Sequence, residues 1–265
     1  MDLNKALEIA RSAAIEAGEE LIKHYGNVEY EAKTETGNTA TDIVTKLDRQ
    51  TESLLSERLS KFDSGVGFRG EEFGVTKEGS KTWLVDPIDG TNHFVRGLPF
   101  CNTMIALIDD GQVVLSVIHD FVRKDTYWAI KGQGAYKNDQ KIHVSNRSLN
   151  QSLLSFETHQ DKPENQKPYF QIQKDGANII STVNCGFEFS MVASGRYDAR
   201  LAFDGYGFDW DYAPGSLLVQ EAGGIVANIG SNKYDYKNHN LIATNPVIFK
   251  ELTEGKNPIF PILSS

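Results

Sequence analysis

The spacing of apolar residues predicts two helices in the first quarter of the chain. Between Asp2 and Tyr25 they form one alanine-rich stripe at helical intervals, and Gly26 ends the pattern. A second helical pattern starts near Thr45, where Thr45-Lys46-Leu47-Asp48 is typical of a capping box. The polar segment from Glu31 to Thr41 lies between the two patterns and predicts a mobile loop.

Alternating apolar and polar positions then predict an antiparallel sheet. Pro87 is expected to stop a buried strand at Asp86, because proline cannot donate to a strand ladder. The other strands are expected at Val66 to Phe68, Thr103 to Asp109, Val113 to Phe121, Thr126 to Ile130 and Ile142 to Val144.

The pattern changes after a polar segment, Ser145 to Leu149, which predicts a boundary between halves 1–147 and 148–265. A strand is expected at Leu153 to Phe156, followed by a polar stretch in which Pro163 and Pro168 act as helix breakers. Beyond these lie a short helix ending at Ala193, a helix from Asp211 to Glu221, and a strand at Ile225 to Ala227.

Composition narrows the class of protein. The 265 residues are 40% hydrophobic and 24% charged, as in an ordinary globular chain. The net charge of -9 argues against binding to nucleic acid or to anionic membranes. No secretory signal or long apolar run is present, and Cys101 and Cys185 fit buried positions in a reducing compartment, so a cytoplasmic location is expected.

The segment Asp86-Pro87-Ile88-Asp89-Gly90-Thr91 carries the strongest chemical pattern. Two carboxylates on a sharp turn, with the Ile88 carbonyl between them, form an all-oxygen ligand set for a hard cation. Gly90 allows close approach of a ligand, and the amides of Gly90 and Thr91 can attract phosphate. The alternative is an ordinary turn without chemistry.

Three further acids have structural interpretations of their own. Glu71 lies in Gly70-Glu71-Glu72, which on composition alone is a solvated loop. Asp48 fits a helix cap, and Asp211 fits the N-cap of the helix that contains Pro214.

These segments together resemble the inositol monophosphatase family of metal-dependent phosphatases. The central segment, with Phe94, Gly97, Pro99 and Phe100 behind it, is similar to the family signature. Similar segments occur in the family's order at Asp42 to Asp48, at Gly70-Glu71-Glu72, and at Trp210 to Gly215 followed by Glu221-Ala222-Gly223-Gly224.

The resemblance implies a layered α/β/α/β/α sandwich with an antiparallel sheet in the N-terminal half and a mixed sheet in the C-terminal half. It also implies a Mg²⁺-dependent phosphomonoesterase with two or three ions. One ion would be held by Glu71, Asp86 and the Ile88 carbonyl, and a second by Asp86, Asp89 and Asp211. Glu71 would also hold the attacking water, and Thr91, oriented by Asp48, would activate it.

The substrate implied by the resemblance is a small phosphorylated polyol, with inositol monophosphate as the first candidate. The chain departs from the family at Arg69, where an apolar residue is usual, and at Asn184-Cys185-Gly186, where Gly-Ser/Thr-Ala is usual. The span before Asp211 is also longer, and Asp204 is either a substrate contact or a solvated turn residue. The implied contacts to phosphate and substrate are Asp89, Gly90, Thr91, Asn184, Gly186 and Asp204.

Other functions stay open at this point. The substrate could be fructose 1,6-bisphosphate, a 3'-phosphoadenosine nucleotide or NADP. A non-catalytic regulator that binds sugar phosphates would be expected to lack one of the acids, and none is missing. A structural or RNA-associated role is disfavoured by the net charge. The resemblance also implies a homodimer.

Overall fold

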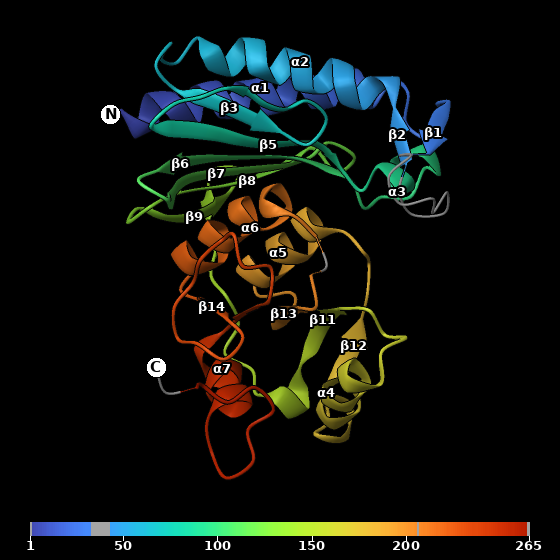
Figure 1. Cartoon of the computed structure of the whole chain (residues 1–265), viewed down its shortest axis with the longest axis vertical. Helices are drawn as coiled ribbons and strands as arrows, with labels where there is room; N and C mark the ends of the chain where they lie inside the picture. The colour runs from blue at the N-terminus through green and yellow to red at the C-terminus, as the bar shows by residue number, and fades with distance from the viewer. Residues whose placement is uncertain (1, 33–42, 206, 264–265) are drawn as a thin grey trace.

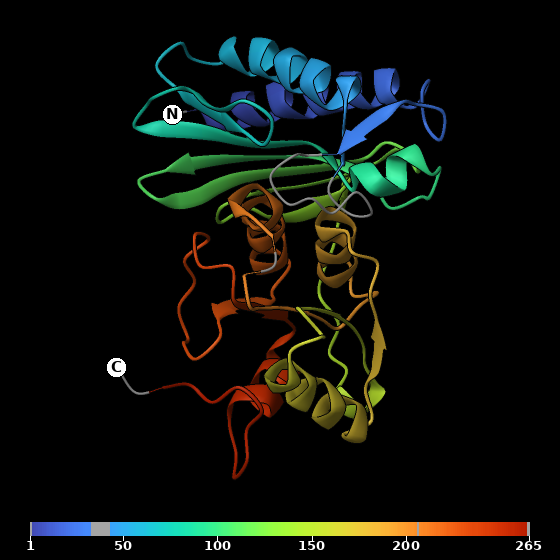
Figure 2. The same cartoon turned by 45° about the vertical axis from the view of Figure 1, so that its right-hand side comes forward.

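The computed structural model describes residues 2–32, 43–205 and 207–263, and these residues form five layers (Figure 1). Helices α1 and α2 cover one face of an eight-stranded sheet, and α5 and α6 lie between that sheet and a five-stranded sheet. Helices α4 and α7 cover the far face of the second sheet, as the turned view in Figure 2 also shows. The predicted α/β/α/β/α sandwich is confirmed.

The eight-stranded sheet has the order β10-β9-β8-β7-β6-β5-β3-β4. Its neighbours are antiparallel except for β3 and β5, which pair in parallel. The strands are β3 (Gly67–Gly70), β4 (Gly74–Lys77), β5 (Lys81–Asp89), β6 (Asn102–Asp109), β7 (Gln112–Asp120), β8 (Asp125–Ile130), β9 (Gly134–Lys137) and β10 (Gln140–Lys141). The short helix α3 (Thr91–Val95) follows β5 directly.

The two predicted N-terminal helices are α1 (Leu3–Leu21) and α2 (Lys46–Ser60). The Asp2 carboxylate accepts hydrogen bonds from the Asn4 and Lys5 amides and caps α1. The apolar faces of both helices pack on the sheet in one buried cluster with residues of β3, β5, β6, β7 and β8. The amphipathic pattern therefore identified the face that each helix buries.

Close packing of α1 on β7 buries His119. A Cβ atom on Gly18 of α1 would lie 2.7 Å from His119 Cδ2, so the helix can approach this closely only through a glycine. His119 Nδ1 lies 2.9 Å from Thr126 Oγ1, and the side chain is buried. Burial lowers the pKa of His119 from 6.5 to about 4, against the opposing charge of Asp125.

We expect His119 to make the free energy of unfolding depend on pH. Between pH 6.5 and about 4 the unfolded chain binds a proton at this imidazole and the folded chain does not, so stability falls as the pH falls. The full loss corresponds to about 3 kcal/mol. Urea unfolding of the wild type and His119→Asn, whose amide can still bond Thr126, measures the difference. If the free energy of unfolding changed with pH to the same extent in the two proteins, the prediction would be contradicted.

The five-stranded sheet has the order β12-β11-β13-β15-β14 and is mixed, as predicted. Its strands are β11 (Leu153–Glu157), β12 (Asn178–Ile180), β13 (Ala199–Ala202), β14 (Ile225–Asn228) and β15 (Leu241–Thr244). The helices of this half are α4 (Pro163–Lys174), α5 (Cys185–Ala193), α6 (Asp209–Glu221) and α7 (Pro246–Thr253), and a 3₁₀ turn, η1 (Leu149–Gln151), precedes β11. The division of the chain at residue 147 stays a prediction.

Three local predictions were wrong. Strand β5 continues through Pro87 to Asp89, because the register shifts between Asp86 and Asp89 and the ladder skips the proline. No strand forms at 142–144, where the Ile142 and Val144 amides donate instead to the carbonyls of Ala135 and Ala222.

The third wrong prediction concerns Pro163 and Pro168, which were expected to break helices. Pro163 starts α4, where its missing amide costs nothing, and Pro168 lies inside the same helix. Ile172 of α4 is buried against the second sheet, and this packing outweighs the lost hydrogen bond.

The loop predicted at Glu31 to Thr41 lies mostly outside the described residues. Its first two residues belong to β1 (Tyr30–Ala32), which pairs antiparallel with β2 (Ile43–Thr45). Within the described parts of the chain, no helix combines the length and apolar character needed to cross a bilayer.

Candidate metal centre

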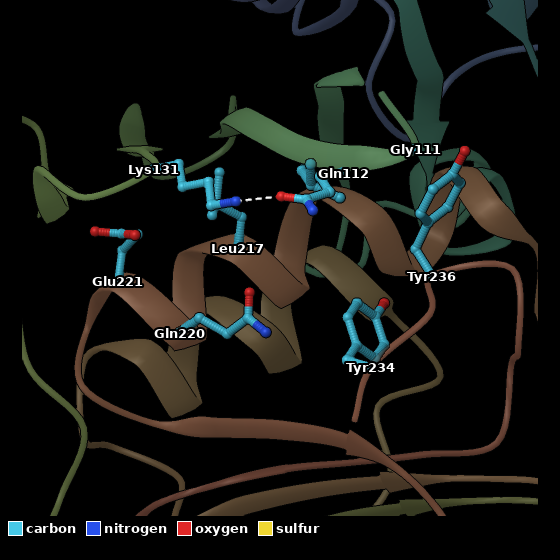
Figure 3. A pocket seen from close by; sticks show the side chains of 9 residues that line it. Gly111, Gln112, Lys131, Leu217, Gln220, Glu221, Tyr234 and Tyr236 are labelled. Carbon is cyan, nitrogen blue, oxygen red and sulfur yellow. Dashed lines mark hydrogen bonds between the residues drawn. The ribbon is translucent and has the colours of Figure 1, made fainter. Parts of the chain in front are cut away.

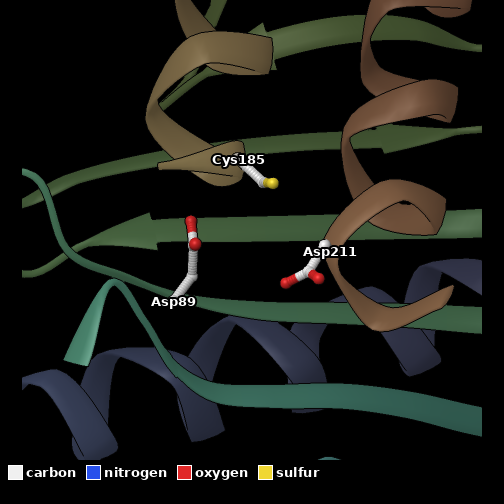
Figure 4. A group of neighbouring side chains, drawn as sticks. All are labelled: Asp89, Cys185 and Asp211. Atoms are coloured by element: carbon white, nitrogen blue, oxygen red, sulfur yellow. The ribbon is translucent and has the colours of Figure 1, made fainter. Parts of the chain in front are cut away.

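Carboxylates from both halves of the chain meet between the first sheet and the middle helices. Asp86 and Asp89 flank the bulge near the end of β5, and Asp211 lies in the first turn of α6. Figure 4 shows Asp89 and Asp211 pointing into one space, with Cys185 entering from the start of α5. One ligand atom from each of these three residues lies within 4.8 Å of the other two.

Burial and mutual repulsion shift the acidity of these groups. The pKa of Asp89 is raised to about 7, chiefly by burial, and that of Asp211 to about 8 by burial and the charges of Asp89 and Glu71. Asp86 has its pKa raised well above the usual value by burial and by Glu71, Asp89 and Asp211. Carboxyl groups this crowded and dry favour a bound cation.

The Asp86 side chain supports the same conclusion. It is 2% exposed, and its Oδ1 has no hydrogen-bond partner within the described part of the chain. A buried carboxylate oxygen normally has a donor or a metal ion beside it. The oxygen-rich ligand set that the sequence predicted is therefore compatible with a hard divalent cation.

Asp48 makes the hydrogen bonds that both of the roles considered for it would require. Its Oδ2 accepts hydrogen bonds from the Thr45 amide at 2.8 Å and the Thr45 hydroxyl at 2.7 Å, which completes the capping box of α2. Its Oδ1 accepts a hydrogen bond from Thr91 Oγ1 at 2.8 Å. Burial raises the pKa of Asp48 to about 6. The helix end is thus a rigid support for the Thr91 hydroxyl.

The turn that carries Glu71 is held by a residue that sequence reasoning missed. Buried Glu52 of α2 accepts hydrogen bonds from the Glu72 amide at 2.7 Å and the Phe73 amide at 3.0 Å. A Cβ atom on Gly70 would lie 2.2 Å from the Glu52 carboxyl carbon, so this position requires glycine. Glu71 is half-buried and hydrogen-bonds to Asp86. The available signal in the sequence was an acidic residue, Glu52, at a position of α2 that faces the core.

Asp89 is fixed by the N-terminus of α5. Its Oδ2 accepts a hydrogen bond from the Gly186 amide at 2.6 Å, and its backbone carbonyl accepts one from Asn184 Nδ2 at 3.0 Å. Asn102, which sequence reasoning also missed, donates to Asn184 Oδ1 at 2.7 Å. A Cβ atom on Gly186 would lie 2.8 Å from Asp89 Oδ2. Asn184 and Gly186, predicted to contact substrate, hold Asp89 in this structure.

A buried ion-pair network lies directly behind the centre. Arg200 of β13 is fully buried, and its Nη2 lies 2.5 Å from Glu157 Oε2 and 2.9 Å from Cys185 Sγ. Arg200 Nε lies 3.4 Å from Glu188 Oε2. This positive charge opposes the raised pKa values of Asp89 and Asp211. It therefore offsets part of the repulsion among the acids.

Gly90 joins β5 to α3 in a conformation that favours glycine. Its φ of +86° lies in the left-handed region, and a Cβ atom would meet the Phe100 carbonyl oxygen at 2.4 Å. The Thr91 hydroxyl also lies 3.0 Å from the Ile88 carbonyl, next to the predicted ligand oxygen. The predicted ligands and Thr91 are therefore neighbours in space.

Comparison with known proteins identifies the family of this chain. A model described as the inositol monophosphatase family matches residues 2–259. The chain belongs to the inositol monophosphatase family.

Two curated relatives and one solved structure illustrate how similar this chain is to other proteins. The fructose-1,6-bisphosphatase/inositol-1-monophosphatase of Thermotoga maritima is 31% identical over 91% of this chain and 92% of its own length. The Nus factor SuhB of Pseudomonas aeruginosa is 34% identical over 96% of this chain and 97% of its own. A solved structure of a Thermotoga maritima IMPase is 30% identical in sequence and has a TM-score of 0.83. The match covers 92% of this chain and 94% of that chain. The fold and the family are confirmed, and the roles of individual residues stay predictions.

In this member of the inositol monophosphatase family, Asp211 does not occupy the helix position that was predicted for it. Helix α6 begins at Asp209, so Asp211 is its third residue and not its N-cap. From there Asp211 Oδ2 accepts a hydrogen bond from the Phe208 amide at 2.7 Å. The departure at Arg69 is explained by pairing, because Arg69 Nη1 lies 2.8 Å from Asp209 Oδ2.

Asp204, the predicted substrate contact, is occupied by neighbours from α4. Its Oδ2 lies 2.7 Å from Lys162 Nζ and 2.9 Å from Asn165 Nδ2, and these contacts lower its pKa. Its φ of +70° is typical of a turn aspartate. The substrate role stays untested, and the observed contacts favour the turn interpretation.

We therefore expect Asp204→Ala to reduce hydrolysis of inositol 1-phosphate and p-nitrophenyl phosphate to the same extent, because only the turn would be loosened. The measurement is kcat/KM for both substrates. A loss at least tenfold greater for the polyol substrate would restore the substrate contact.

A separate pocket lies beside the C-terminal end of α6, with a volume of about 270 Å³. Figure 3 shows Glu221 at its edge and a hydrogen bond from Lys131 to Gln112 across it. Glu221 already accepts hydrogen bonds from the Gly132 and Gly134 amides at 2.7 and 2.8 Å. Glu221 is the one carboxylate among the described residues that line this pocket, whereas Asp211 and the other clustered carboxylates lie at the other end of α6. The lining residues are Gly111, Gln112, Val113, Lys131, Leu217, Gln220, Glu221, Tyr234 and Tyr236.

Proposed function

We propose that the protein is a Mg²⁺-dependent phosphomonoesterase that hydrolyses a small phosphorylated polyol, with inositol monophosphate as the first candidate. The observation that carries the proposal is the group of buried Asp86 and Asp89 with half-buried Asp211, beside the hydrogen-bonded pair of Asp48 and Thr91. Membership in the inositol monophosphatase family supports it.

The ligand roles follow the resemblance. Glu71, Asp86 and the Ile88 carbonyl would hold one Mg²⁺, and Asp86, Asp89 and Asp211 a second. Carboxylate and carbonyl oxygens are the ligands that Mg²⁺ prefers. Bound Mg²⁺ would neutralise the phosphate and lower the pKa of a coordinated water. The number of ions, two or three, is part of the proposal.

Thr91 would orient the attacking water. Its single hydroxyl proton is donated to Asp48 Oδ1 at 2.8 Å, a shorter contact than the 3.0 Å to the Ile88 carbonyl. The oxygen lone pairs are then directed to accept a hydrogen bond from water. Asp48, buried and fixed by the α2 cap, would accept the proton through Thr91 as the water attacks.

We expect Thr91→Val to lower kcat by about 10²-fold with little change in KM. Valine keeps the shape and the backbone amide and removes the hydroxyl that would orient water. Steady-state kinetics on inositol 1-phosphate give both constants. If KM rises while kcat is unchanged, Thr91 only binds substrate.

Phosphate release from a panel of monoesters, with Mg²⁺ or with a chelator, tests the function. The panel includes inositol 1-phosphate, fructose 1,6-bisphosphate, a 3'-phosphoadenosine nucleotide and NADP. Fructose 1,6-bisphosphate is the second candidate, because the name of the Thermotoga maritima relative combines both activities. Hydrolysis that needs Mg²⁺ supports the proposal. Release from no substrate would favour the alternative of a regulator that binds sugar phosphates.

Three further expectations belong to this proposal: a homodimer, a cytoplasmic location and no binding to nucleic acid. The net charge of -9 supports the third. The name Nus factor, carried by the Pseudomonas aeruginosa relative, is not the name of a phosphatase. Binding of labelled RNA and DNA at low salt would therefore be measured beside phosphatase activity.

A further inference from the structure

A sulfur atom lies beside the two carboxylates that Figure 4 shows. Cys185 Sγ and one carboxylate oxygen each of Asp89 and Asp211 are within 4.8 Å of one another. Cys185 is the first residue of α5 and is 9% exposed, so its side chain faces the cluster and not water. From the sequence, Cys185 was expected to be buried and to lie in the turn Asn184-Cys185-Gly186, where the chain departs from the family.

The spacing of these three atoms suits a small four-coordinate cation. A Zn²⁺ ion with bonds of about 2.3 Å to sulfur and about 2.1 Å to oxygen places its ligand atoms roughly 3.6 Å apart. The three side chains would therefore close by roughly 1 Å or less around such an ion. Rotation of a side chain achieves a shift of this size without moving the helices.

A second observation indicates that a ligand is needed here. Asp86 Oδ1 is buried without a hydrogen-bond partner among the described residues, and the charge of Asp86 interacts with those of Asp89 and Asp211. An unpartnered buried oxygen is costly, and a bound cation removes that cost. Asp86 thus adds a negative charge beside the cluster, while the three ligand atoms that lie together come from Asp89, Cys185 and Asp211.

Burial raises the pKa of the Cys185 thiol well above its usual value, and the positive charge of Arg200 opposes this shift. Arg200 Nη2 lies 2.9 Å from Cys185 Sγ and donates to it, and the guanidinium is fixed by its 2.5 Å contact with Glu157. A charged donor of this kind stabilises the deprotonated sulfur that metal coordination requires.

We propose that Asp89, Cys185 and Asp211 form a site for a thiophilic divalent cation of the Zn²⁺ class. Thiolate sulfur favours Zn²⁺ over Mg²⁺, whereas a site of oxygen atoms alone does not make this distinction strongly. The inference rests on the proposed function in one respect, because the site shares Asp89 and Asp211 with the proposed Mg²⁺ centre. Zn²⁺ therefore competes with Mg²⁺ for the same ligands.

Binding is an exchange of a proton for a metal ion. The S–H bond of Cys185 breaks, its electron pair forms the bond from sulfur to the cation, and the proton passes to the buffer. No oxidant or reductant takes part. Zn²⁺ binding consequently tightens as the pH rises.

The test uses the full-length protein stripped of metal and then titrated with Co²⁺ alone, which replaces Zn²⁺ and is visible by absorption. Co²⁺ bound to a thiolate gives an intense charge-transfer band in the near ultraviolet, and Co²⁺ bound only to oxygen does not. The chain offers a matched control, because Cys101 and Cys185 are its two cysteines and both are buried. In Cys101→Ser the remaining thiol is that of Cys185.

We expect the band in the wild type and in Cys101→Ser, and its loss in Cys185→Ser. Competition with a chromophoric chelator should show Zn²⁺ affinity at least about tenfold lower in Cys185→Ser, with Mg²⁺ affinity changed much less. Circular dichroism checks that each variant is folded. Because Cys101→Ser isolates Cys185, the test stands even if Cys185→Ser fails to fold. Absence of the band from Cys101→Ser would overturn the inference.

The outcome is separable from that of the phosphatase assay, since metal binding is read without substrate. If the protein gives the charge-transfer band of Cys185 but hydrolyses no phosphate ester, the metal site is supported and the proposed function is rejected. If the protein hydrolyses phosphate esters with Mg²⁺ but gives no thiolate band, the inferred Zn²⁺ site is rejected and the proposed function stands.

Discussion

Asp86→Asn is expected to lower phosphatase activity by about 10³-fold or more, because a bound metal supplies several kcal/mol of transition-state stabilisation. Asp86 is the acid shared by both proposed ions, so its replacement weakens both. Asparagine keeps the size and one carbonyl oxygen of the side chain. The loss is therefore expected to come from the missing charge.

The same substitution should raise the melting temperature of the metal-free protein. Burial and the charges of Glu71, Asp89 and Asp211 raise the pKa of Asp86, so the folded state at neutral pH contains a repelled, desolvated carboxyl group. A raised carboxyl pKa stabilises the folded state only below the unfolded pKa, and this contribution is lost as the pH rises. A neutral amide removes the repulsion at every pH.

Melting curves with and without Mg²⁺, together with kcat/KM, measure both effects. Mg²⁺ should stabilise the wild type more than Asp86→Asn, since a ligand stabilises the state that binds it. Asp109→Asn removes one charge from a half-exposed pair with Lys81, away from the centre, and serves as the control. Wild-type activity in Asp86→Asn would rule out the proposed metal centre.

Arg200→Met is expected to lower the free energy of unfolding by about 3–5 kcal/mol, the cost of breaking a buried ion pair from one side. Glu157 and Glu188 are both buried and would lose their positive partner. Burial and the charge of Glu188 already raise the pKa of Glu157 to about 8. Without Arg200 the two acids must take up protons, so the loss should be larger at pH 8 than at pH 6.

Urea unfolding at the two pH values gives the free energies. The matched control combines Arg200→Met with Glu157→Gln and Glu188→Gln, which removes all three charges at once. This triple variant should recover most of the loss, because replacing a whole buried charge set is far less costly than removing one member. If Arg200→Met alone lowers the free energy of unfolding by less than about 1 kcal/mol, the buried network does not depend on Arg200.

The sequence by itself determined the features that depend on neighbouring residues. Apolar periodicity located α1 and the long strands of the first sheet. The pattern from Thr45 to Asp48 located the start of α2, since a capping box is completed within four residues. The glycine and carboxylate order around Asp89 also indicated the candidate metal centre, because a turn brings these groups together wherever it is folded.

Only the tertiary structure decided how segments distant along the chain meet. Pro87 remains within β5 because β6 pairs with residues on both sides of a bulge, and Pro168 remains within α4 because the second sheet buries that helix. Cys185 is a small apolar residue by sequence, and packing of α5 places it between Asp89 and Asp211. Contacts between residues far apart depend on packing of the whole chain, and local sequence patterns carry no information about them.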